Sequence, residues 1–226
     1  MNTVLARVPV SRLLRTPRAW VMIGAWTVLA VGFAAAARAQ GSAHGADHAL
    51  VGAFGALVVP LLCYAIAGGA LGATSLSAAG APAVAFGATP PRAAAATVAV
   101  VVVASAAACA VLGATVAIVA HGSSDPPVAR DAIASAYAGA LGGAAYASLF
   151  ALGSTFGRRG GGRTVALVAD WLLGANATAV AFVTPRAHLR NLLGGTPPAG
   201  LGERGSAIAL VLVIVVFATL AVRRTR

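Results

Sequence analysis

The sequence has no lysine, and only five acidic residues and two cysteines occur among its 226 residues. A lysine is essential to the phosphate-binding loop G-x-x-x-x-G-K-[ST], because its side chain reaches the terminal phosphates of the nucleotide. An ATP- or GTP-hydrolysing site of this type is therefore excluded from this polypeptide. Any energy from ATP has to come from a partner, and the chain itself is predicted to be neither an enzyme nor the holder of a cofactor.

Charge of either sign is scarce along the whole chain. Charged residues make up 9% of it, whereas about a quarter of a soluble domain is charged. Hydrophobic residues make up 59%, so water is not the main solvent of this protein. The net charge of +11 comes from arginines in short clusters between apolar runs rather than on one basic face. We therefore expect no nucleic acid partner.

Six apolar runs are long enough to cross a hydrocarbon core of about 30 Å as helices, which rise about 1.5 Å per residue. They predict an all-α integral membrane protein with one transmembrane domain over residues 1–226 and spans at about 19–37, 49–71, 93–120, 132–156, 164–184 and 206–222. Pro60 predicts a kink in the second span. Cys63 and Cys109 lie inside spans and are interpreted as small buried residues rather than as a disulfide or metal site.

Arginine is unevenly distributed among the segments that join these spans. With the N-terminus in the cytoplasm, 11 of the 16 arginines are cytoplasmic and 5 lie outside. Arginine is enriched in the cytoplasmic loops of membrane proteins. The pattern predicts both termini in the cytoplasm and a multi-pass protein of the cell (cytoplasmic or inner) membrane. The outer arginines are Arg38, Arg130, Arg186, Arg190 and Arg204.

The first span has a competing interpretation. An arginine-bearing leader, an apolar stretch and the small residues around Arg38 also describe a secretory signal peptide cleaved after Ala39, which would leave five spans. The apolar run is longer than the usual 7 to 15 residues, and the leader before it is also long. We therefore expect an uncleaved first helix.

Two segments are expected to lie along the membrane interfaces. Before the first span, arginines alternate with apolar residues in a basic amphipathic stretch that we expect to be broken near Pro9. After the fifth span, Thr184 and Pro185 begin a short helix that Gly194 ends. Its leucines share one face and its arginines another, which predicts an outer interfacial helix acting as a passive cap or as a gate. Its polar members are Arg186, His188 and Arg190.

Polar groups inside the spans are few. Asp170 and Asn176 both lie in the fifth predicted span, and Asp170 is the only acid within any span. A carboxylate in a membrane faces protein or water rather than lipid. Arg163 lies two helical turns earlier on the same face, so Asp170 is interpreted either as its ion-pair partner or as a functional group. Small residues at spacings of four in the fourth span predict close helix packing: Ser135, Gly139, Gly143, Ala147 and Ala151.

Metal binding and catalysis have weak signals only. His44, Asp47 and His48 stand together in the first outer loop, but two histidines and one acid in a loop of small residues do not predict a metal site. An intramembrane serine protease needs a serine and a histidine within hydrogen-bond reach. Ser154 is a candidate nucleophile, but all four histidines fall in loops or at span ends, so neither an enzyme nor a metal site is predicted.

The layout nevertheless resembles a known family, the permease subunits of ATP-binding-cassette exporters of the type-2 class. The residues that carry the resemblance are the leader Ser11-Arg12-Leu13-Leu14-Arg15-Thr16-Pro17-Arg18, the cytoplasmic stretch Gly87-Ala88-Thr89-Pro90-Pro91-Arg92, and Thr184-Pro185-Arg186-Ala187-His188-Leu189 after the fifth span. It extends over nearly the whole chain. The stretch from residue 72 to 92 lacks the acid that members of the family often have there.

The resemblance implies a function in which this chain moves a hydrophobic or amphipathic substrate and a separate subunit hydrolyses ATP. It also implies a homodimer or heterodimer of permeases in contact with membrane lipids, and a coupling segment between the second and third spans that meets the ATPase. The residues assigned to that segment are Ala83, Ala85, Gly87 and Arg92. The alternative is a membrane scaffold or accessory subunit that transports nothing.

Overall fold

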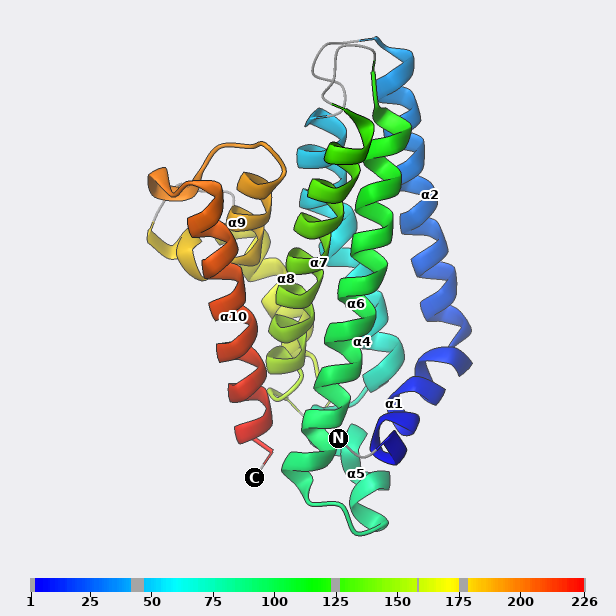
Figure 1. The fold of residues 1–226 in the computed structure, drawn as a ribbon. Helices are drawn as coiled ribbons and strands as arrows, with labels where there is room; N and C mark the ends of the chain where they lie inside the picture. The colour runs from blue at the N-terminus through cyan, green and yellow to red at the C-terminus, as the bar shows by residue number, and fades with distance from the viewer. Residues whose placement is uncertain (1–2, 42–46, 123–126, 158, 175–178, 226) are drawn as a thin grey trace.

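The computed structural model describes residues 3–41, 47–122, 127–157, 159–174 and 179–225, and its fold is drawn in Figure 1. These residues form helices and connecting turns, with no strand among them. The all-α prediction is confirmed for this part of the chain. The helices are α1 (Thr3–Arg15), α2 (Pro17–Ala39), η1 (His48–Val58), α4 (Val59–Leu71), α5 (Leu76–Ala85), α6 (Pro90–Ala120), α7 (Val128–Gly153), α8 (Gly162–Leu173), η2 (Ala179–Val183), α9 (Pro185–Leu192), η3 (Pro198–Gly200) and α10 (Glu203–Arg223).

Five helical runs among the described residues are long and apolar enough to cross a membrane. They run up and down in one bundle, with α1, α5 and the C-terminal end of α10 at the same end (Figure 1). Their lengths and composition fit a multi-pass membrane protein. The runs are Pro17–Ala39, Ala49–Ala85, Pro90–Ala120, Val128–Gly153 and Glu203–Arg223.

The fifth predicted span, residues 164–184, is not one continuous helix. α8 has 12 residues, so it is only about 18 Å long, less than the roughly 30 Å of a hydrocarbon core. The chain then continues through η2 and α9 to the level at which α10 begins (Figure 1). Within the part of the chain that the structure describes, six continuous spans are therefore not found, and the short helices α8, η2 and α9 stand in the fifth place. Non-helical backbone is tolerated at membrane depth where protein covers it.

The second predicted span changes helix type just before its proline. η1 is a π-helix, and the Val59 N–H donates to the Phe54 carbonyl five residues earlier. Pro60 then falls in the first turn of α4, the part of a helix where proline is best tolerated. α1 likewise continues through Pro9, so the predicted break there is wrong.

The predicted stripe of small residues lies in the tightest helix contact, between α6 and α7. A Cβ added to Gly143 would lie 2.6 Å from the Ser105 carbonyl oxygen of α6. One added to Gly113 of α6 would lie 2.5 Å from the Ser135 carbonyl oxygen of α7. These backbones touch because neither helix has a side chain between them. The interpretation of the stripe as helix packing is confirmed.

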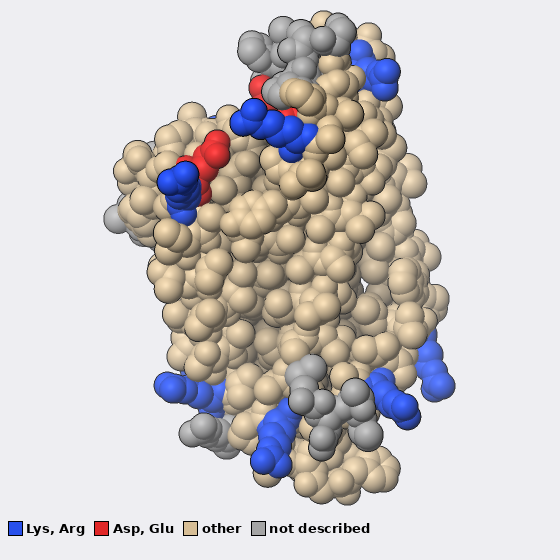
Figure 2. Space-filling view, in the orientation of Figure 1, with Lys and Arg blue, Asp and Glu red and all other residues tan. Residues whose placement is uncertain are grey.

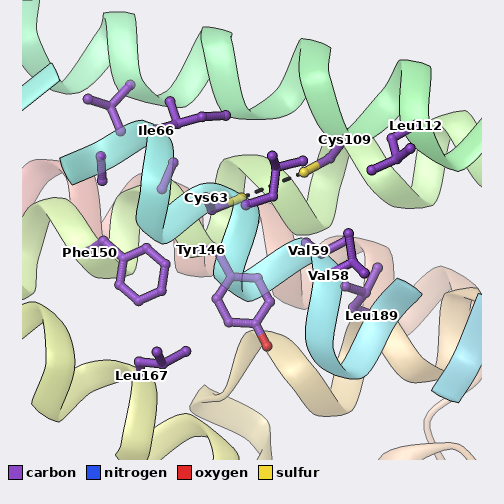
Figure 3. Packing of buried hydrophobic residues seen from close by; sticks show 14 of the residues in the cluster. Val58, Val59, Cys63, Ile66, Cys109, Leu112, Tyr146, Phe150, Leu167 and Leu189 are labelled. Carbon is purple, nitrogen blue, oxygen red and sulfur yellow. Dashed lines mark hydrogen bonds between the residues drawn. The ribbon is translucent and has the colours of Figure 1, made fainter. Parts of the chain in front are cut away.

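The core lies where α4, α6 and α7 meet. Cys63 of α4 and Cys109 of α6 are fully buried, with free thiols 3.6 Å apart (Figure 3). The interpretation of both cysteines as small buried residues is confirmed. On the face drawn in Figure 2, charged side chains gather at the two ends and an uncharged belt separates them. The end near α5 shows arginine only, and the opposite end shows both signs (Figure 2).

Candidate functional site

The predicted coupling segment folds into α5, a ten-residue helix at one end of the bundle. The Ser75 hydroxyl accepts a hydrogen bond from the Ala78 N–H at 3.3 Å, which satisfies a free donor of the first turn. One face of α5 packs on α1 and α6 and is buried at Leu76 and Ala79. Arg12 of α1 donates from Nη1 to the Ala79 carbonyl oxygen at 2.9 Å. α5 is thus fixed to the bundle and to the amphipathic N-terminal helix.

The end of α5 carries an exposed aromatic ring. Phe86 is 92% exposed, the largest exposed fraction of the large hydrophobic side chains described. It borders a groove of about 360 Å³ between α1 and the end of α5, which also includes Ala83, Gly87 and Arg92. Ala83 is buried at the bottom, whereas Ala85 is exposed and does not line this groove. We call Phe86, Gly87, Ala88 and Arg92 the α5 tip.

Arg163 fastens the start of α8 to the end of α4, directly before α5. Its guanidinium is buried and donates to three carbonyl oxygens: Nη2 to Gly72 at 2.7 Å, Nη1 to Ala67 at 3.3 Å and Nε to Gly160 at 3.2 Å. Gly72 follows the last residue of α4, so the cation lies at the negative end of that helix dipole. We call Arg163 with Ala67, Gly72 and Gly160 the Arg163 clamp.

Two backbone contacts reinforce the Arg163 clamp. The Leu76 N–H at the start of α5 donates to the Ser154 carbonyl oxygen at 3.1 Å. Gly160 has φ +63°, and a Cβ there would lie 2.5 Å from the Thr74 carbonyl oxygen. Only glycine combines that backbone conformation with that approach. The turn between α7 and α8 is therefore pinned to the turn between α4 and α5.

Asp170 is buried, and it pairs with α7 and α9 rather than with Arg163. The Tyr146 hydroxyl donates to its Oδ2 at 2.6 Å, and the Arg186 backbone N–H donates to its Oδ1 at 3.3 Å. In Figure 3 the Tyr146 hydroxyl points away from the two cysteines. Arg186 is the second residue of α9, so Asp170 supplies the carboxylate that caps this helix. The predicted ion pair with Arg163 is wrong, because Arg163 uses its three donor nitrogens in the clamp.

A second buried polar group joins α9 to α10. The His188 Nε2 lies 3.0 Å from the Phe182 carbonyl oxygen, which only accepts, so Nε2 carries a proton. In the neutral ring Nδ1 is then the acceptor for the Ser206 hydroxyl, 3.2 Å away. Asn191 donates from Nδ2 to Ser206 Oγ at 2.9 Å and to the Leu201 carbonyl oxygen at 2.8 Å. Every member of this chain of hydrogen bonds has a consistent donor or acceptor role.

The pairing of Ser206 with His188 has the elements of an activated nucleophile. Both side chains have 0% exposure, however, and the Ser206 oxygen also accepts from Asn191. As these residues lie, neither water nor a substrate reaches the hydroxyl. Ser154, the serine singled out from the sequence, is also buried and donates to the Phe150 carbonyl oxygen at 2.6 Å. Both hydroxyls therefore serve packing in this arrangement.

α9 has the predicted bounds but not the predicted surroundings. Its leucine face contacts protein: a Cβ on Gly142 of α7 would lie 2.8 Å from Leu189, and one on Gly55 of η1 would lie 2.7 Å from Leu193. Leu189 and His188 are fully buried, whereas Arg190 is exposed. Arg186 is half-buried and donates from Nη1 to the Trp171 carbonyl oxygen at 3.1 Å. The leucine face therefore packs on protein, because the glycines of η1 and α7 make room for it.

Some predicted residues lie outside the described part of the chain. Asn176 and His44 are among them, so the structure gives them no neighbours. Within the described residues, no group of three or more histidine, cysteine or acidic side chains is placed to hold a metal ion. The weak metal hypothesis at His44 therefore stays as the sequence left it.

Tyr146, Asn191 and Ser206 were not singled out from the sequence. Tyr146 and Ser206 are polar residues in apolar helices, which is the only signal that points to them, and the polar helix α9 gives no such signal for Asn191. The side-chain partners of Tyr146 and Asn191 are 24 and 15 residues away along the chain. In comparisons with known proteins, no protein-family model, no curated protein and no solved structure matches the chain.

Proposed function

We propose that this chain is the membrane-spanning permease subunit of an ATP-binding-cassette exporter. In this proposal a separate subunit hydrolyses ATP and docks on the α5 tip from the cytoplasm. The chain lacks the lysine of a nucleotide-binding loop, so this division of labour suits it. The cargo is hydrophobic or amphipathic, the working unit contains two permeases, and the membrane is the cytoplasmic one, all as the sequence resemblance implies.

The observation that carries the proposal is the way α5 is built into the bundle. At the α5 tip the Phe86 side chain is 92% exposed and borders a groove. An exposed aromatic ring beside a groove is typical of a site that anchors a partner protein. The face in Figure 2 shows only arginine at this end, and cytoplasmic ends are the arginine-rich ones. The α5 tip therefore has both an apolar anchor and the charge expected of a cytoplasmic surface.

The Arg163 clamp supplies a route from the α5 tip into the membrane. It binds the turn before α5 to the start of α8, and the last turn of α8 contains Asp170, whose carboxylate caps α9. A shift of α5 is thus passed through Arg163 to α8 and then to α9. We propose that docking and release of the ATPase move this series of helices and so change access to the cargo path.

Purification of the tagged chain from its native membranes tests the proposal. We expect a subunit with a complete phosphate-binding loop to purify with the wild-type chain and with Phe86→Leu, which keeps an apolar anchor. Phe86→Asp should lose that subunit while inserting normally, because the contact would bury an unpaired charge. Equal recovery with Phe86→Asp would remove the α5 tip from the interface. Absence of any such subunit from the wild-type preparation would favour a scaffold over a permease.

A further inference from the structure

A second groove lies between α6 and α10, and it begins on α6 one helical turn after Arg92 of the α5 tip. It has a volume of about 430 Å³, and its described lining is apolar apart from Thr219 and one charged residue. The residues that shape it are Ala95, Ala99 and Val102 of α6 with Ile214, Ala218 and Arg223 of α10. Because Ala99 and Ala218 are small, the two helices do not fill the space between them.

The groove has the dimensions of one membrane leaflet. From Ala95 to Val102 α6 rises about 10 Å, and from Ile214 to Arg223 α10 rises about 14 Å. Half of a hydrocarbon core is about 15 Å thick. An acyl chain can therefore lie in the groove over most of the thickness of one leaflet. The groove ends at Arg223.

Arg223 is the charged group at that end of the groove. It is exposed, and among the described residues its guanidinium has no hydrogen-bond or ion-pair partner. The next residue, Arg224, is placed differently, because its guanidinium carbon lies 4.2 Å above the centre of the Phe156 ring. An arginine fork beside an apolar groove complements a lipid phosphate and its acyl chain.

We propose that this groove binds an anionic phospholipid, with an acyl chain along α6 and α10 and its phosphate on Arg223. Apolar matching alone gives no preference over bulk lipid, because lipid tails are as apolar as the groove. Selectivity therefore comes from the charge of Arg223. The site needs neither an ATPase nor transport, so it stands independently of the proposed function.

Native mass spectrometry of the full-length chain in a neutral detergent tests this site. Phosphatidylglycerol and phosphatidylcholine with identical acyl chains are added in equal amounts. We expect the wild-type chain to retain phosphatidylglycerol preferentially, and Arg223→Gln to reduce that preference about fivefold, the factor that corresponds to about 1 kcal/mol for one arginine at the surface. Arg224→Gln is the matched control, since it removes the same charge one residue along and should keep the preference.

A second variant fills the groove without touching the charge. Ala99→Leu combined with Ala218→Leu should reduce retention of both lipids, whereas Ala107→Leu, at an exposed position of α6 outside the groove, should not. Three results would overturn the proposal: no lipid preference in the wild-type chain, an equal effect of Arg223→Gln and Arg224→Gln, or unchanged retention in the filled variant. A wild-type dimer without bound lipid that the filled variant converts to a monomer would assign the groove to a second copy instead.

Discussion

Asp170 shows how a single acid is accommodated in a chain with so few charges. Its two oxygens accept from Tyr146 and from the backbone of Arg186, so one side chain ties α7, α8 and α9 together. The sequence identifies such a residue, because an acid inside an apolar run is conspicuous. It does not identify the partners, because Tyr146 lies 24 residues earlier and the turn back to Arg186 requires α8 to end early.

Substitutions of Asp170 test how much its two hydrogen-bond acceptors contribute to stability. Asp170→Leu leaves the Tyr146 hydroxyl and the Arg186 N–H without acceptors, and each orphaned buried donor costs about 1–3 kcal/mol. Asp170→Asn keeps an acceptor for one of them and should cost less. Tyr146→Phe leaves the buried Asp170 Oδ2 without its donor and should therefore also destabilise the fold, but less than Asp170→Leu, which orphans two donors. Thermal unfolding in detergent measures this order, and a Leu variant as stable as wild type would refute the capping role.

Arg163 is a positioning residue with a geometry that lysine does not reproduce. Its fork reaches three carbonyl oxygens at once, whereas an ammonium group is a single point charge. We expect Arg163→Lys to insert normally but to reduce stimulation of the proposed ATPase subunit severalfold, because the hydrogen bonds between the start of α8 and the end of α4 are weakened. Stimulation at the wild-type level in Arg163→Lys would show that the clamp transmits nothing. Arg159→Lys, at an exposed arginine of the same turn, is the control.

The helices differ in how well the hydrophobic pattern of the sequence predicts their bounds. α2, α6, α7 and α10 match predicted spans to within four residues at each end, because a long apolar run has one solution in a bilayer. The predicted span over residues 164–184 is not one helix, and the reason lies in neighbouring parts of the fold rather than in the hydropathy of this segment. Residues 164–184 are apolar enough to cross, but the start of α9 lies so close that a Cβ on Gly174 would come within 2.8 Å of the Arg186 side chain. Hydropathy contains no information about that approach.

The α6 and α7 contact gives a test at the scale of whole helices. In Gly143→Ala the new Cβ meets the backbone of Ser105, so the helices must separate, at a cost of about 1–3 kcal/mol. Gly24→Ala in α2 is the matched control, because nothing lies within 4 Å of its new Cβ. The control should be neutral or up to about 1 kcal/mol more stable from helix propensity. Equal unfolding temperatures for both variants would contradict the close packing.

Across the whole molecule, the two ends of the chain lie at the same end of the bundle, as they would with six spans. α1 and the C-terminal end of α10 share one end of the bundle, although only five helical runs among the described residues are long enough to cross. The path through α8, η2 and α9 takes the place of a span. The arginine count also predicts both termini on one side, and it depends on where the connecting segments lie and not on how each crossing is built.

Reporter fusions test this topology. Fusions after Gly41, Gly122 and Gly200 should report the outside, and one after Gly161 should report the cytoplasm. The Gly200 fusion distinguishes the alternatives most sharply, because it follows α8, η2 and α9. A cytoplasmic signal there would mean that α8 and α9 return to the side from which they started.

In the proposed function, the α5 tip docks an ATP-hydrolysing subunit in the cytoplasm. The most direct test of this docking is photo-cross-linking in intact cells with Phe86→p-benzoylphenylalanine, using Phe33→p-benzoylphenylalanine on the exposed face of α2 as the control. We predict that position 86 forms a covalent product with a protein that has a phosphate-binding loop and that position 33 does not. If position 86 instead forms products only with lipid or with proteins outside the cytoplasm, the α5 tip does not dock an ATPase subunit.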